Sequence, residues 1–563
     1  MRPLLTLHNP AVAKEYYAKG YWQNDTYYTL LERHAAQQPE AYALQDSTRR
    51  LTYRELLNAV DQFAAELHGM GLVQGERLSI WLPNCVESVV VFLACSRNGY
   101  VANPSLHQNH TVAEVVACLD RLQVSVLVAK RGYGADAQEH DIFEEARKVG
   151  SVRRLISLGD KPAANHGLRF DDLSYGADLS VQPAPDNNPD KIVYLAFTSG
   201  TTGEPKGVMH SDNTLLANGR ALVNDWGVNA ETIIYSLSPL SHHIGTVAIS
   251  QALVGGCELV INDLPSRQSP IDHIEQTGAT YVMGVPTHAL DLLSELDRRG
   301  STALGHVKTF YMAGAAIPRS LAERFLKLGI RPQNVYGMTE NGSHQYTLPS
   351  DDVDTIVGTC GRSAFGFETA IFDAENPDRP LPIGEVGEIG TRGALLMLGY
   401  FANQRATENS FNRLGWFLSG DLGQMDDNGC LSIVGRKKDL IIRGGHNIHP
   451  THIEALAIRH PHVKSVAAIP VPDDRLGERV CLVVRPLQDR TVAADEILAF
   501  LHEQGLSKYD MPEFFLSVED FPMTASGKIL KRKLVEFVQE GVVTPTAVRW
   551  VDPAKQNEVS NGN

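Results

Sequence analysis

A ten-residue segment in the first half of the chain concentrates groups that bind phosphate. It reads Thr198-Ser-Gly-Thr-Thr-Gly-Glu-Pro-Lys-Gly207 and follows the apolar run Ile192-Val-Tyr-Leu-Ala-Phe197. Glycines let backbone N–H groups approach an anion, hydroxyl groups donate to phosphate oxygens, and Lys206 adds a positive charge. A Walker loop starting at Gly200 would need Gly before Lys206 and Ser or Thr after it, which this segment lacks. The segment predicts an anion site of another kind, with a polar surface turn as the alternative.

Two later segments offer groups suited to a nucleotide and its counter-ion. In Val335-Tyr-Gly-Met-Thr-Glu340, Tyr336 presents a flat face for a purine and Glu340 an oxygen ligand of the kind that Mg²⁺ prefers. Asp421, which ends Trp416-Phe-Leu-Ser-Gly-Asp421, can accept hydrogen bonds from both hydroxyl groups of a ribose. The alternatives are core packing for Tyr336 and turn capping for Asp421.

The elements that must position these groups alternate between strand and helix. Thr52 and Glu55 form a capping-box pair at the start of a helix whose apolar residues recur at helical spacing as far as Leu67. Apolar runs predict strands at residues 77–82, 124–128, 192–197, 233–237, 258–261, 281–283 and 309–312. Such alternation predicts parallel sheets covered by helices, in which ligands bind beyond the carboxyl ends of strands. The Gly-rich loop lies at such an end.

The chain is too long for one core, because single cores stop growing near ~250–300 residues and this chain has 563. Its character changes beyond about Gly435, where short strands at 465–469 and 480–484 precede a helix at 494–504. We expect an α/β protein with a large N-terminal domain of helix-covered, mostly parallel sheets, residues 1–437. A small mobile α+β domain with a polar tail would follow at residues 438–563.

Composition excludes several classes of protein. The net charge of −15 argues against nucleic-acid binding, which needs a basic face. Seven cysteines without a CxxC pair lack the spacing of a cysteine zinc site and fit a reduced compartment. The start of the chain has too short an apolar stretch for a signal peptide, and no run approaches the ~18 apolar residues of a membrane span. We expect a cytoplasmic protein without a membrane span; the sequence allows a homodimer.

In this order, the segments resemble the motifs of the adenylate-forming superfamily, which comprises acyl-CoA synthetases, peptide-synthetase adenylation domains and beetle luciferases. Gly435-Arg-Lys-Lys-Asp439 resembles the family's hinge, and Pro522-Met-Thr-Ala-Ser-Gly-Lys528 its C-terminal lysine loop. The resemblance covers the chain from about residue 30 to 540. It implies a small-molecule carboxylic acid, ATP, Mg²⁺ and coenzyme A as the partners of the reaction.

The resemblance assigns ATP or AMP binding to residues spread over the whole chain. These residues are Thr198, Ser199, Gly200, Thr201, Thr202, Gly203, Lys206, Gly314, Ala315, Ala316, Asn334, Val335, Tyr336, Gly337, Thr339, Asp421, Arg436 and Lys528. Glu340 is expected to bind the metal ion. Lys528 is expected to be catalytic, since a lysine near the α-phosphorus stabilises charge that develops in the transition state.

The same resemblance gives the C-terminal domain a role in the second half-reaction. Lys438 occupies the hinge position about which the small domain rotates between half-reactions in the family. Gly444, Gly445 and His446 correspond to the segment that lines the channel for the pantetheine arm of CoA. A tight turn leading into a helix after Pro450 is the alternative interpretation of that segment.

The segment Pro239-Leu-Ser-His-His-Ile-Gly245 resembles the family's Pro-Leu-aromatic-His-x-x-Gly motif. His242 takes the histidine position, which implies a catalytic role near the carboxylate, and Ser241 replaces the usual aromatic residue. The expected acyl pocket is lined by His242, Val285, Met312, Gly314 and Met338. These mostly small or apolar groups suit an uncharged hydrocarbon acid. No Asp occurs from Tyr235 to Ile249, which disfavours an amino acid substrate.

Two segments, Glu15-Tyr-Tyr-Ala-Lys-Gly-Tyr-Trp22 and Thr309-Phe-Tyr-Met-Ala-Gly-Ala-Ala316, look most like those of bacterial cyclohexanecarboxylate–CoA ligases. Aromatic and medium-chain fatty acids are the alternative substrates. An adenylating enzyme that loads a carrier protein is a second alternative. A non-catalytic acyl or nucleotide binder is the third, although the retained lysines and carboxylates disfavour it.

Overall fold

The computed structural model describes residues 5–160, 168–171, 173, 179, 182–198, 205–265, 268–523 and 528–550. Its contacts divide the chain into two compact units, each described by itself below. The first unit holds the residues up to Ala370 together with Gly390–Phe417 and Met425–Ser432. The second unit holds Ile371–Ile389, Leu418–Gln424 and the residues from Ile433 onward.

The largest sheet of the first unit has nine strands. In spatial order they are β15 (Arg362–Ser363), β14 (Gly342–Tyr346), β13 (Arg331–Met338), β12 (Thr309–Ala313), β11 (Tyr281–Gly284), β9 (Ile233–Ser236), β10 (Glu258–Ile261), β1 (Tyr42–Gln45) and β2 (Arg50–Thr52). The central pairs are parallel, whereas β2, β14 and β15 pair in the antiparallel sense at the two edges. The mostly parallel sheet confirms the expectation from strand–helix alternation.

A second sheet of the same unit has six strands. Their order is β6 (Arg154–Ser157), β5 (Val126–Ala129), β3 (Arg77–Trp81), β4 (Val101–Asn103), β7 (Ile192–Thr198) and β8 (Lys206–Ser211). All pairs except β7–β8 are parallel. The antiparallel β7–β8 hairpin puts the ends of the Gly-rich loop at the edge of this sheet.

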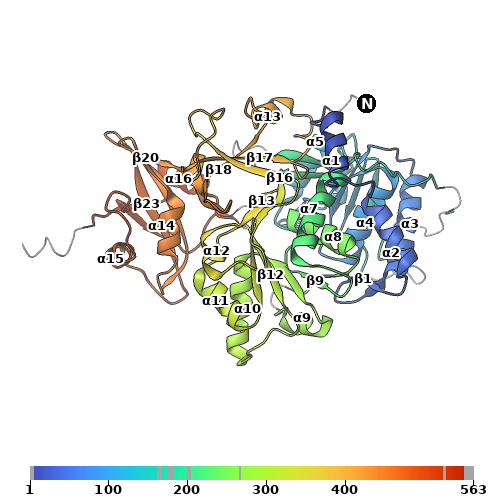
Figure 1. Ribbon diagram of the computed structural model, residues 1–563, viewed down its shortest axis with the longest axis horizontal. Helices are drawn as coiled ribbons and strands as arrows, with labels where there is room; N and C mark the ends of the chain where they lie inside the picture. The colour runs from blue at the N-terminus through green and yellow to red at the C-terminus, as the bar shows by residue number, and fades with distance from the viewer. Residues whose placement is uncertain are drawn as a thin grey trace, which may run out of the picture. The chain divides into compact units, whose positions relative to one another are not determined.

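Helices cover both faces of both sheets. Their bounds are α1 (Pro10–Ala18), α2 (Tyr27–Gln37), α3 (Tyr53–Gly69), α4 (Val86–Asn98), α5 (Val112–Leu122), α6 (Ile142–Ala146), α7 (Asp212–Trp226), α8 (His243–Gly255), α9 (Ile271–Thr277), α10 (Pro286–Arg299), α11 (Arg319–Lys327), α12 (Val353–Gly358) and α13 (Gln404–Glu408). In Figure 1, α2, α3 and α4 lie together and α7 lies beside α8.

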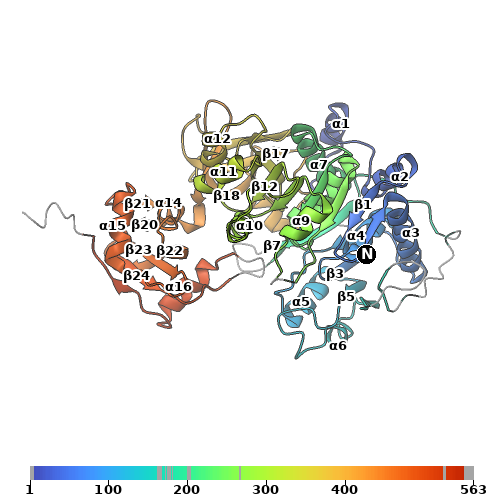
Figure 2. The same cartoon turned by 90° about the horizontal axis from the view of Figure 1, so that it is seen from below.

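The cores explain this layering. One core joins the inner faces of the two sheets through α2, α3, α4, α7 and α8. A second core packs α9, α10 and α11 on the outer face of the nine-stranded sheet. A third packs α5 and α6 on the outer face of the six-stranded sheet (Figure 2). Strands covered on both faces must be apolar on both, which is why their sequences read as continuous apolar runs.

Four strands between residues 367 and 436 form a separate sheet that the sequence analysis did not predict. Their order is β16 (Phe367–Phe372), β17 (Gly387–Gly393), β18 (Phe417–Met425) and β19 (Leu431–Arg436). Charged and polar residues interrupt these strands, as in Phe417-Leu-Ser-Gly-Asp-Leu-Gly-Gln-Met425, so they lack the apolar runs that mark buried parallel strands.

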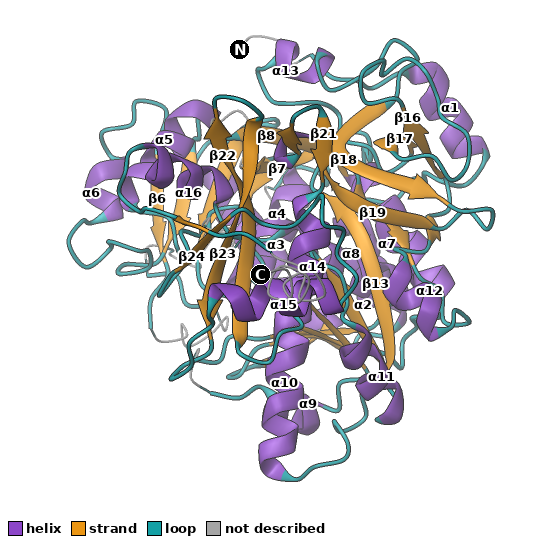
Figure 3. Cartoon of the chain, turned by 90° about the vertical axis from the view of Figure 1, so that its left-hand side faces the viewer, coloured by secondary structure: helices purple, strands orange, loops and turns teal. Residues whose placement is uncertain are grey.

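The second unit contains a six-stranded sheet. Its strands are β20 (Ile441–Arg443), β21 (His446–Ile448), β22 (Val463–Asp473), β23 (Gly477–Pro486), β24 (Phe514–Ser517) and β25 (Thr546–Ala547). Its helices, shown with β22 to β24 in Figure 3, are α14 (Pro450–Ala457), α15 (Ala494–Glu503) and α16 (Lys531–Gln539). Alternate residues of β23 face two cores: Leu482 and Val484 face α14 and α15, whereas Cys481 and Val483 face α16.

The predicted helix that follows Thr52 is α3. The Thr52 hydroxyl accepts from the backbone N–H of Glu55, and the Glu55 carboxylate accepts from the backbone N–H of Thr52, which confirms the capping box. None of the helices that the structure describes is long and apolar enough to cross a lipid bilayer.

Candidate active site

The β7–β8 hairpin holds the two ends of the predicted phosphate loop together. Thr198, the last residue of β7, pairs with Lys206, the first residue of β8. Lys206 also lies over the ring of Tyr400, with Nζ 4.7 Å from the ring centroid. The loop residues Ser199, Gly200, Thr201, Thr202 and Gly203, predicted to bind phosphate, lie outside the described part of the chain.

The predicted metal ligand Glu340 is buried beside this hairpin. The hydroxyl of Thr198 donates to its Oε1 at 3.4 Å, and the hydroxyl of Tyr400 donates to the same oxygen at 3.0 Å. Burial raises the pKa of the Glu340 carboxyl, and its own backbone N–H, Tyr400 and Lys206 oppose that shift. The fold therefore brings the predicted residue Glu340 next to Thr198 and Lys206, although Glu340 lies 142 residues beyond Thr198 in the sequence.

Tyr400 is a member of this cluster that the sequence analysis missed. It follows the apolar stretch Leu395-Leu-Met-Leu-Gly399, where a tyrosine is typical of core packing, so its sequence context gives no functional signal. Its backbone accounts for the placement, because Val208 in β8 forms a bridge with Tyr400.

The turn between β13 and β14 is fixed tightly. A Cβ atom on Gly337 would lie 1.8 Å from the carbonyl oxygen of Gly342, so only glycine fits at this position. The carbonyl oxygen of Thr339 lies 2.6 Å from Nε2 of His210. Burial lowers the pKa of His210 to about 4, so the ring is neutral near pH 7 and donates from Nε2 to this carbonyl. His210 positions the Thr339 backbone and was also missed by the sequence analysis.

Two predicted adenine-binding segments meet at the carboxyl ends of β12 and β13 in the nine-stranded sheet. Ala313 in β12 pairs with Val335 in β13, so Gly314–Ala316 leave the sheet next to Tyr336. Gly314, Ala315 and Ala316 are exposed, and Tyr336 is half-buried with its ring against His344. The amide of Asn334 instead donates to the carbonyls of Ile356 and Thr359. Its side chain therefore fixes the local structure.

His242 is the N-cap residue of α8, and its ring packs against that of His107 in a tilted arrangement. The ring centroids lie 4.4 Å apart, and Nδ1 of His107 lies 2.9 Å from the hydroxyl of Ser241. Burial, reinforced by His242, lowers the pKa of His107 to about 3. Where the family usually has an aromatic residue, Ser241 thus places a hydroxyl group that is hydrogen-bonded to a neutral imidazole. His107, in the polar stretch Leu106-His-Gln-Asn-His110, carried no signal in the sequence.

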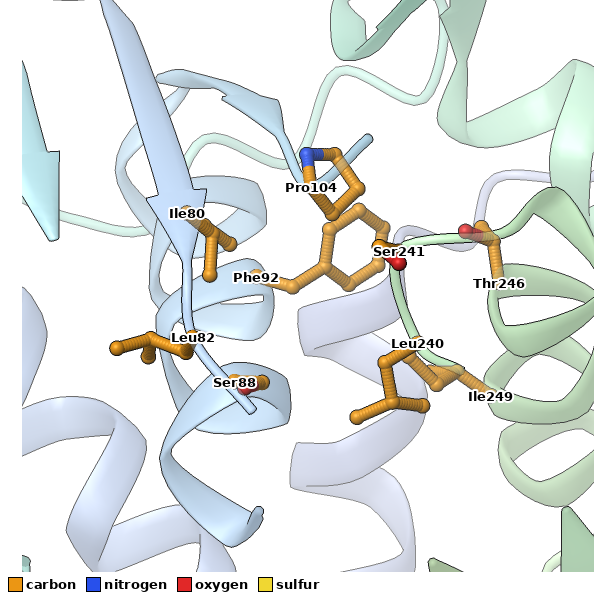
Figure 4. A pocket seen from close by; sticks show the side chains of 9 residues that line it. All are labelled: Ile80, Leu82, Ser88, Phe92, Pro104, Leu240, Ser241, Thr246 and Ile249. Atoms are coloured by element: carbon orange, nitrogen blue, oxygen red, sulfur yellow. The ribbon is translucent and has the colours of Figure 1, made fainter. Parts of the chain in front are cut away.

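A small cavity adjoins Ser241 (Figure 4). Strand β3 and helices α4 and α8 line the cavity, together with the residues that follow β3 and β4 and the segment that precedes α8. The lining residues are Ile80, Leu82, Ser88, Phe92, Pro104, Leu240, Ser241, Thr246 and Ile249. None of them is charged. The lining is therefore mostly apolar, with three hydroxyl groups at the cavity wall.

The other predicted acyl-pocket residues occupy different environments. Val285 is the N-cap residue of α10, and its Cγ1 would lie 3.8 Å from a Cβ on Gly314, so these two positions are neighbours. Met312 is completely buried in the core of α9 to α11. Met338 is partly buried against Val208 and Tyr400. Val285 and Gly314 thus lie together, whereas Met312 packs in the core.

In the second unit, Asp421 and Arg436 form an ion pair. Nε of Arg436 lies 3.1 Å from Oδ1 of Asp421, and the Asp421 side chain is 8% exposed against 51% for Arg436. Both residues belong to strands, Asp421 to β18 and Arg436 to β19. The two residues predicted to contact the nucleotide from this part of the chain therefore lie together.

The predicted hinge residue Lys438 is exposed in the short 3₁₀ helix Lys437–Asp439, which directly follows β19. Its neighbour Lys437 forms an ion pair with Glu388 at 2.7 Å. The turn is thus anchored on one side of Lys438.

The predicted CoA-channel segment is a hairpin. Gly444 and Gly445 form the two-residue turn between β20 and β21, with φ of +58° and +84° that favour glycine. Nε2 of His446 lies 3.0 Å from Oδ1 of Asp510, and both glycines are exposed. The segment is thus a tight turn that leads into α14 at Pro450. Because both residues of the turn are glycines, the turn carries no side chains.

The predicted catalytic lysine, Lys528, is exposed. It precedes Ile529, which forms a bridge with Met523, and the backbone N–H of Leu530 donates to the carbonyl of Pro522. Lys528 thus directly precedes residues that are held to Pro522 and Met523 by backbone contacts.

Comparisons with known proteins identify the family of the chain. Residues 31–401 match the model of the AMP-binding enzyme family, and residues 452–528 match that of the AMP-binding enzyme C-terminal domain. The chain is 29% identical to a medium-chain fatty-acid–CoA ligase of Escherichia coli, covering 92% of this chain and 91% of that protein. It is 30% identical to a 2-hydroxy-7-methoxy-5-methyl-1-naphthoate–CoA ligase of Streptomyces carzinostaticus, covering 93% and 95%.

Among solved structures, ATP-bound MatB from Rhodopseudomonas palustris superimposes with a TM-score of 0.80 at 27% identity, covering 92% of this chain and 100% of that one. The family model spans most of the chain, and the mixed sheets and small second unit match the fold of this relative. The chain therefore belongs to the AMP-binding enzymes, the adenylate-forming superfamily, and is an enzyme of its acyl-CoA synthetase group.

Proposed function

We propose that the protein is an ATP-dependent carboxylic acid–CoA ligase that works through an acyl-adenylate. In the first half-reaction, a substrate carboxylate oxygen attacks the α-phosphorus of ATP, and the bond to the pyrophosphate oxygen breaks. In the second, the deprotonated thiol of CoA attacks the acyl carbon, and AMP leaves with the bonding electrons. Acid, ATP and CoA are thereby converted into acyl-CoA, AMP and pyrophosphate.

The observation that carries this proposal is the cluster at the ends of the Gly-rich loop. Thr198 and Tyr400 hold one oxygen of the buried Glu340, and Lys206 lies beside it. A carboxylate held in a buried site next to a loop rich in backbone and hydroxyl donors is suited to a triphosphate and its counter-ion.

The donor set at Glu340 fits Mg²⁺. This ion is usually held by one or two carboxylates together with phosphate oxygens and water. Burial raises the pKa of Glu340, so a nearby cation would stabilise the ionised form. When bound, the ion neutralises charge on the phosphate oxygens. Thr198 and Tyr400 orient the Glu340 carboxylate, and Lys206 supplies a further positive charge to the phosphates.

We propose that the Asp421 carboxylate accepts hydrogen bonds from the ribose hydroxyls of the nucleotide and that Arg436 orients this carboxylate. Replacing Asp421 with alanine should lower kcat/KM for ATP by roughly 10- to 100-fold, because hydrogen bonds to charged groups contribute about 1.5–3 kcal/mol. Steady-state kinetics at varied ATP measures the effect. The exposed neighbour Asp427, replaced with alanine, is the matched control. Equal kinetics for the two variants would remove Asp421 from the nucleotide site.

The substrate that we propose is cyclohexanecarboxylate or a similar hydrophobic acid. The uncharged lining of the cavity at Ser241 and the neighbouring positions Val285 and Gly314 support a hydrocarbon group. The relatives named for a medium-chain fatty acid and for a naphthoate support medium-chain and aromatic acids as alternatives. A panel of cyclic, aromatic and straight-chain acids, assayed with and without CoA, ranks the three classes. Turnover without CoA would favour an enzyme that loads a carrier protein.

Filling the cavity tests its role directly. Ser241→Phe places a ring where the hydroxyl faces the cavity, so kcat/KM for cyclohexanecarboxylate should fall by about 10-fold or more, as pockets discriminate by roughly 10–200-fold per methylene. Activity with acetate, which needs no such space, should change much less. Ser241→Ala removes only the hydroxyl and is the control for loss of the bond to His107. A parallel loss for both acids would place the cavity outside the acyl site.

We further propose that residues 1–437 and 438–563 are the two functional domains, since the latter carries the proposed hinge, channel segment and Lys528. The seven free thiols support a cytoplasmic location. We also propose that the protein forms a homodimer, which sedimentation of the purified chain would test.

A further inference from the structure

Two histidines and a glutamate meet in the second unit, in a part of the chain to which the proposed reaction assigns no role. His460 and His462 belong to the turn between α14 and β22, and Glu496 lies in the first turn of α15. His460 is 5% exposed and packs edge-on against Phe500 of α15, with ring centroids 5.0 Å apart. Packing in the domain core therefore fixes the turn and the helix with respect to each other.

The ligand atoms of these side chains converge. Oε1 of Glu496 lies 3.2 Å from Nε2 of His460 and 3.5 Å from Nδ1 of His462. One ligand atom from each of the three residues lies within 4.8 Å of the other two. No other such group of three or more His, Cys, Asp or Glu occurs in the part of the chain that the structure describes. Zn²⁺ binds nitrogen and oxygen ligands at ~2.0–2.2 Å in a tetrahedron, which places neighbouring ligand atoms about 3.3–3.6 Å apart. The two separations from Oε1 of Glu496 are close to this edge length.

One of the three ligand atoms, Nδ1 of His462, forms no hydrogen bond with the described residues. It is buried and has no such partner among them, although it faces Oε1 of Glu496. A buried ring nitrogen without a partner is unfavourable, and a bound cation would satisfy it. The His462 and Glu496 side chains are 35% and 43% exposed, which leaves the solvent side of the group open to a metal ion and to a water ligand.

The surrounding hydrogen bonds orient two of the ligands. The backbone N–H of Ala493 donates to Oε2 of Glu496 at 3.4 Å, leaving Oε1 directed at the histidines. The backbone N–H of His462 donates to Nδ1 of His460 at 3.3 Å, so the neutral ring carries its proton on Nε2. Coordination through Nε2 requires the other tautomer, with the proton on Nδ1, and gives up this long hydrogen bond.

We propose that His460, His462 and Glu496 form a site for a divalent transition metal of the Zn²⁺ type, with water as the fourth ligand. Imidazole ligands select such ions over Mg²⁺, which prefers oxygen ligands, so the site is distinct from the magnesium ion of the proposed reaction. The metal joins the turn before β22 to the start of α15. It is a structural link within the small domain and takes no part in acyl transfer.

Metal binding by the tag-free full-length protein tests this site without an activity assay. The metal-stripped chain is titrated with Zn²⁺ by calorimetry and with Co²⁺ by visible absorption, in the absence of nucleotide. His462→Ala and Glu496→Gln are the test variants; the amide of the second variant keeps an oxygen acceptor for the N–H of Ala493. His452→Ala removes an exposed histidine of α14 and is the matched control.

We expect the unaltered chain and the His452 variant to bind one equivalent of either metal, with a Co²⁺ spectrum of tetrahedral nitrogen and oxygen ligation. Both test variants should bind at least ~10-fold more weakly, a loss seen even when outer-shell partners are removed. Their metal-free thermal unfolding midpoints should match that of the unaltered chain, which separates loss of a ligand from loss of the fold. Unchanged affinity in both test variants, a thiolate charge-transfer band, or no binding by the unaltered chain would overturn the proposal.

Discussion

Replacing Lys528 with alanine should abolish most adenylate formation and leave the second half-reaction intact. The proposed role of Lys528 is to stabilise charge that builds up as the carboxylate attacks the α-phosphorus. Loss of one such group typically lowers the rate by about 10²- to 10³-fold. Pyrophosphate release should therefore fall by that factor, while thioester formation from supplied acyl-adenylate and CoA should continue at its original rate.

Lys533 offers a matched control for this experiment. It is a partly exposed lysine of α16 whose ammonium group pairs with Glu536, and its replacement by alanine removes the same charge nearby. The Lys533 variant should retain adenylation. If the Lys528 variant lost both half-reactions equally, the lysine would contribute to general binding or folding and its proposed role would be wrong.

Replacing Lys438 with proline should separate the half-reactions in the opposite sense. Proline fixes φ near −65° and also restricts the preceding residue, so the turn Lys437–Asp439 can no longer absorb a change of backbone angles. A restriction of about 3 kcal/mol corresponds to roughly a 100-fold loss in the step that needs the change. Adenylation should persist, whereas thioester formation from isolated acyl-adenylate should fall by that factor.

Single-turnover assays of each half-reaction measure this separation. Lys438→Ala removes the charge but keeps backbone freedom, so it should leave both half-reactions close to their original rates. The hinge role would be contradicted by a Lys438→Pro enzyme that transfers the acyl group to CoA at an unchanged rate.

Local sequence patterns predicted much of the fold because helix capping and strand burial depend on residues that are close together in the sequence. The capping box at Thr52 fixes the start of α3, and strands buried on both faces, such as Val480-Cys-Leu-Val-Val484 in β23, must be apolar throughout. The sheet formed by β16 to β19 escaped prediction since its strands carry polar residues such as Asp421 and Arg436. We expect these two residues to serve the nucleotide site, and their strand character depends on partners distant in the sequence.

The candidate site could be predicted only in part from the residues themselves. Types and spacing predicted that Lys206 binds phosphate and that Glu340 binds a metal ion, but the resemblance to a family was needed for the prediction at Arg436. Tyr400, His107 and His210 were missed because their neighbours give no signal. Each contacts the site through a partner from another part of the chain: Glu340 for Tyr400, Ser241 for His107 and Thr339 for His210.

The central claim, a reaction through an acyl-adenylate, is tested most directly by trapping that intermediate. The protein is incubated with cyclohexanecarboxylate, ATP and Mg²⁺, and enzyme-bound products are analysed by mass spectrometry before and after CoA is added. We expect about one equivalent of acyl-AMP per active site without CoA, converted on its addition into acyl-CoA and AMP. No acyl-AMP with any acid of the panel, or acyl-AMP that CoA leaves unchanged, would contradict the account.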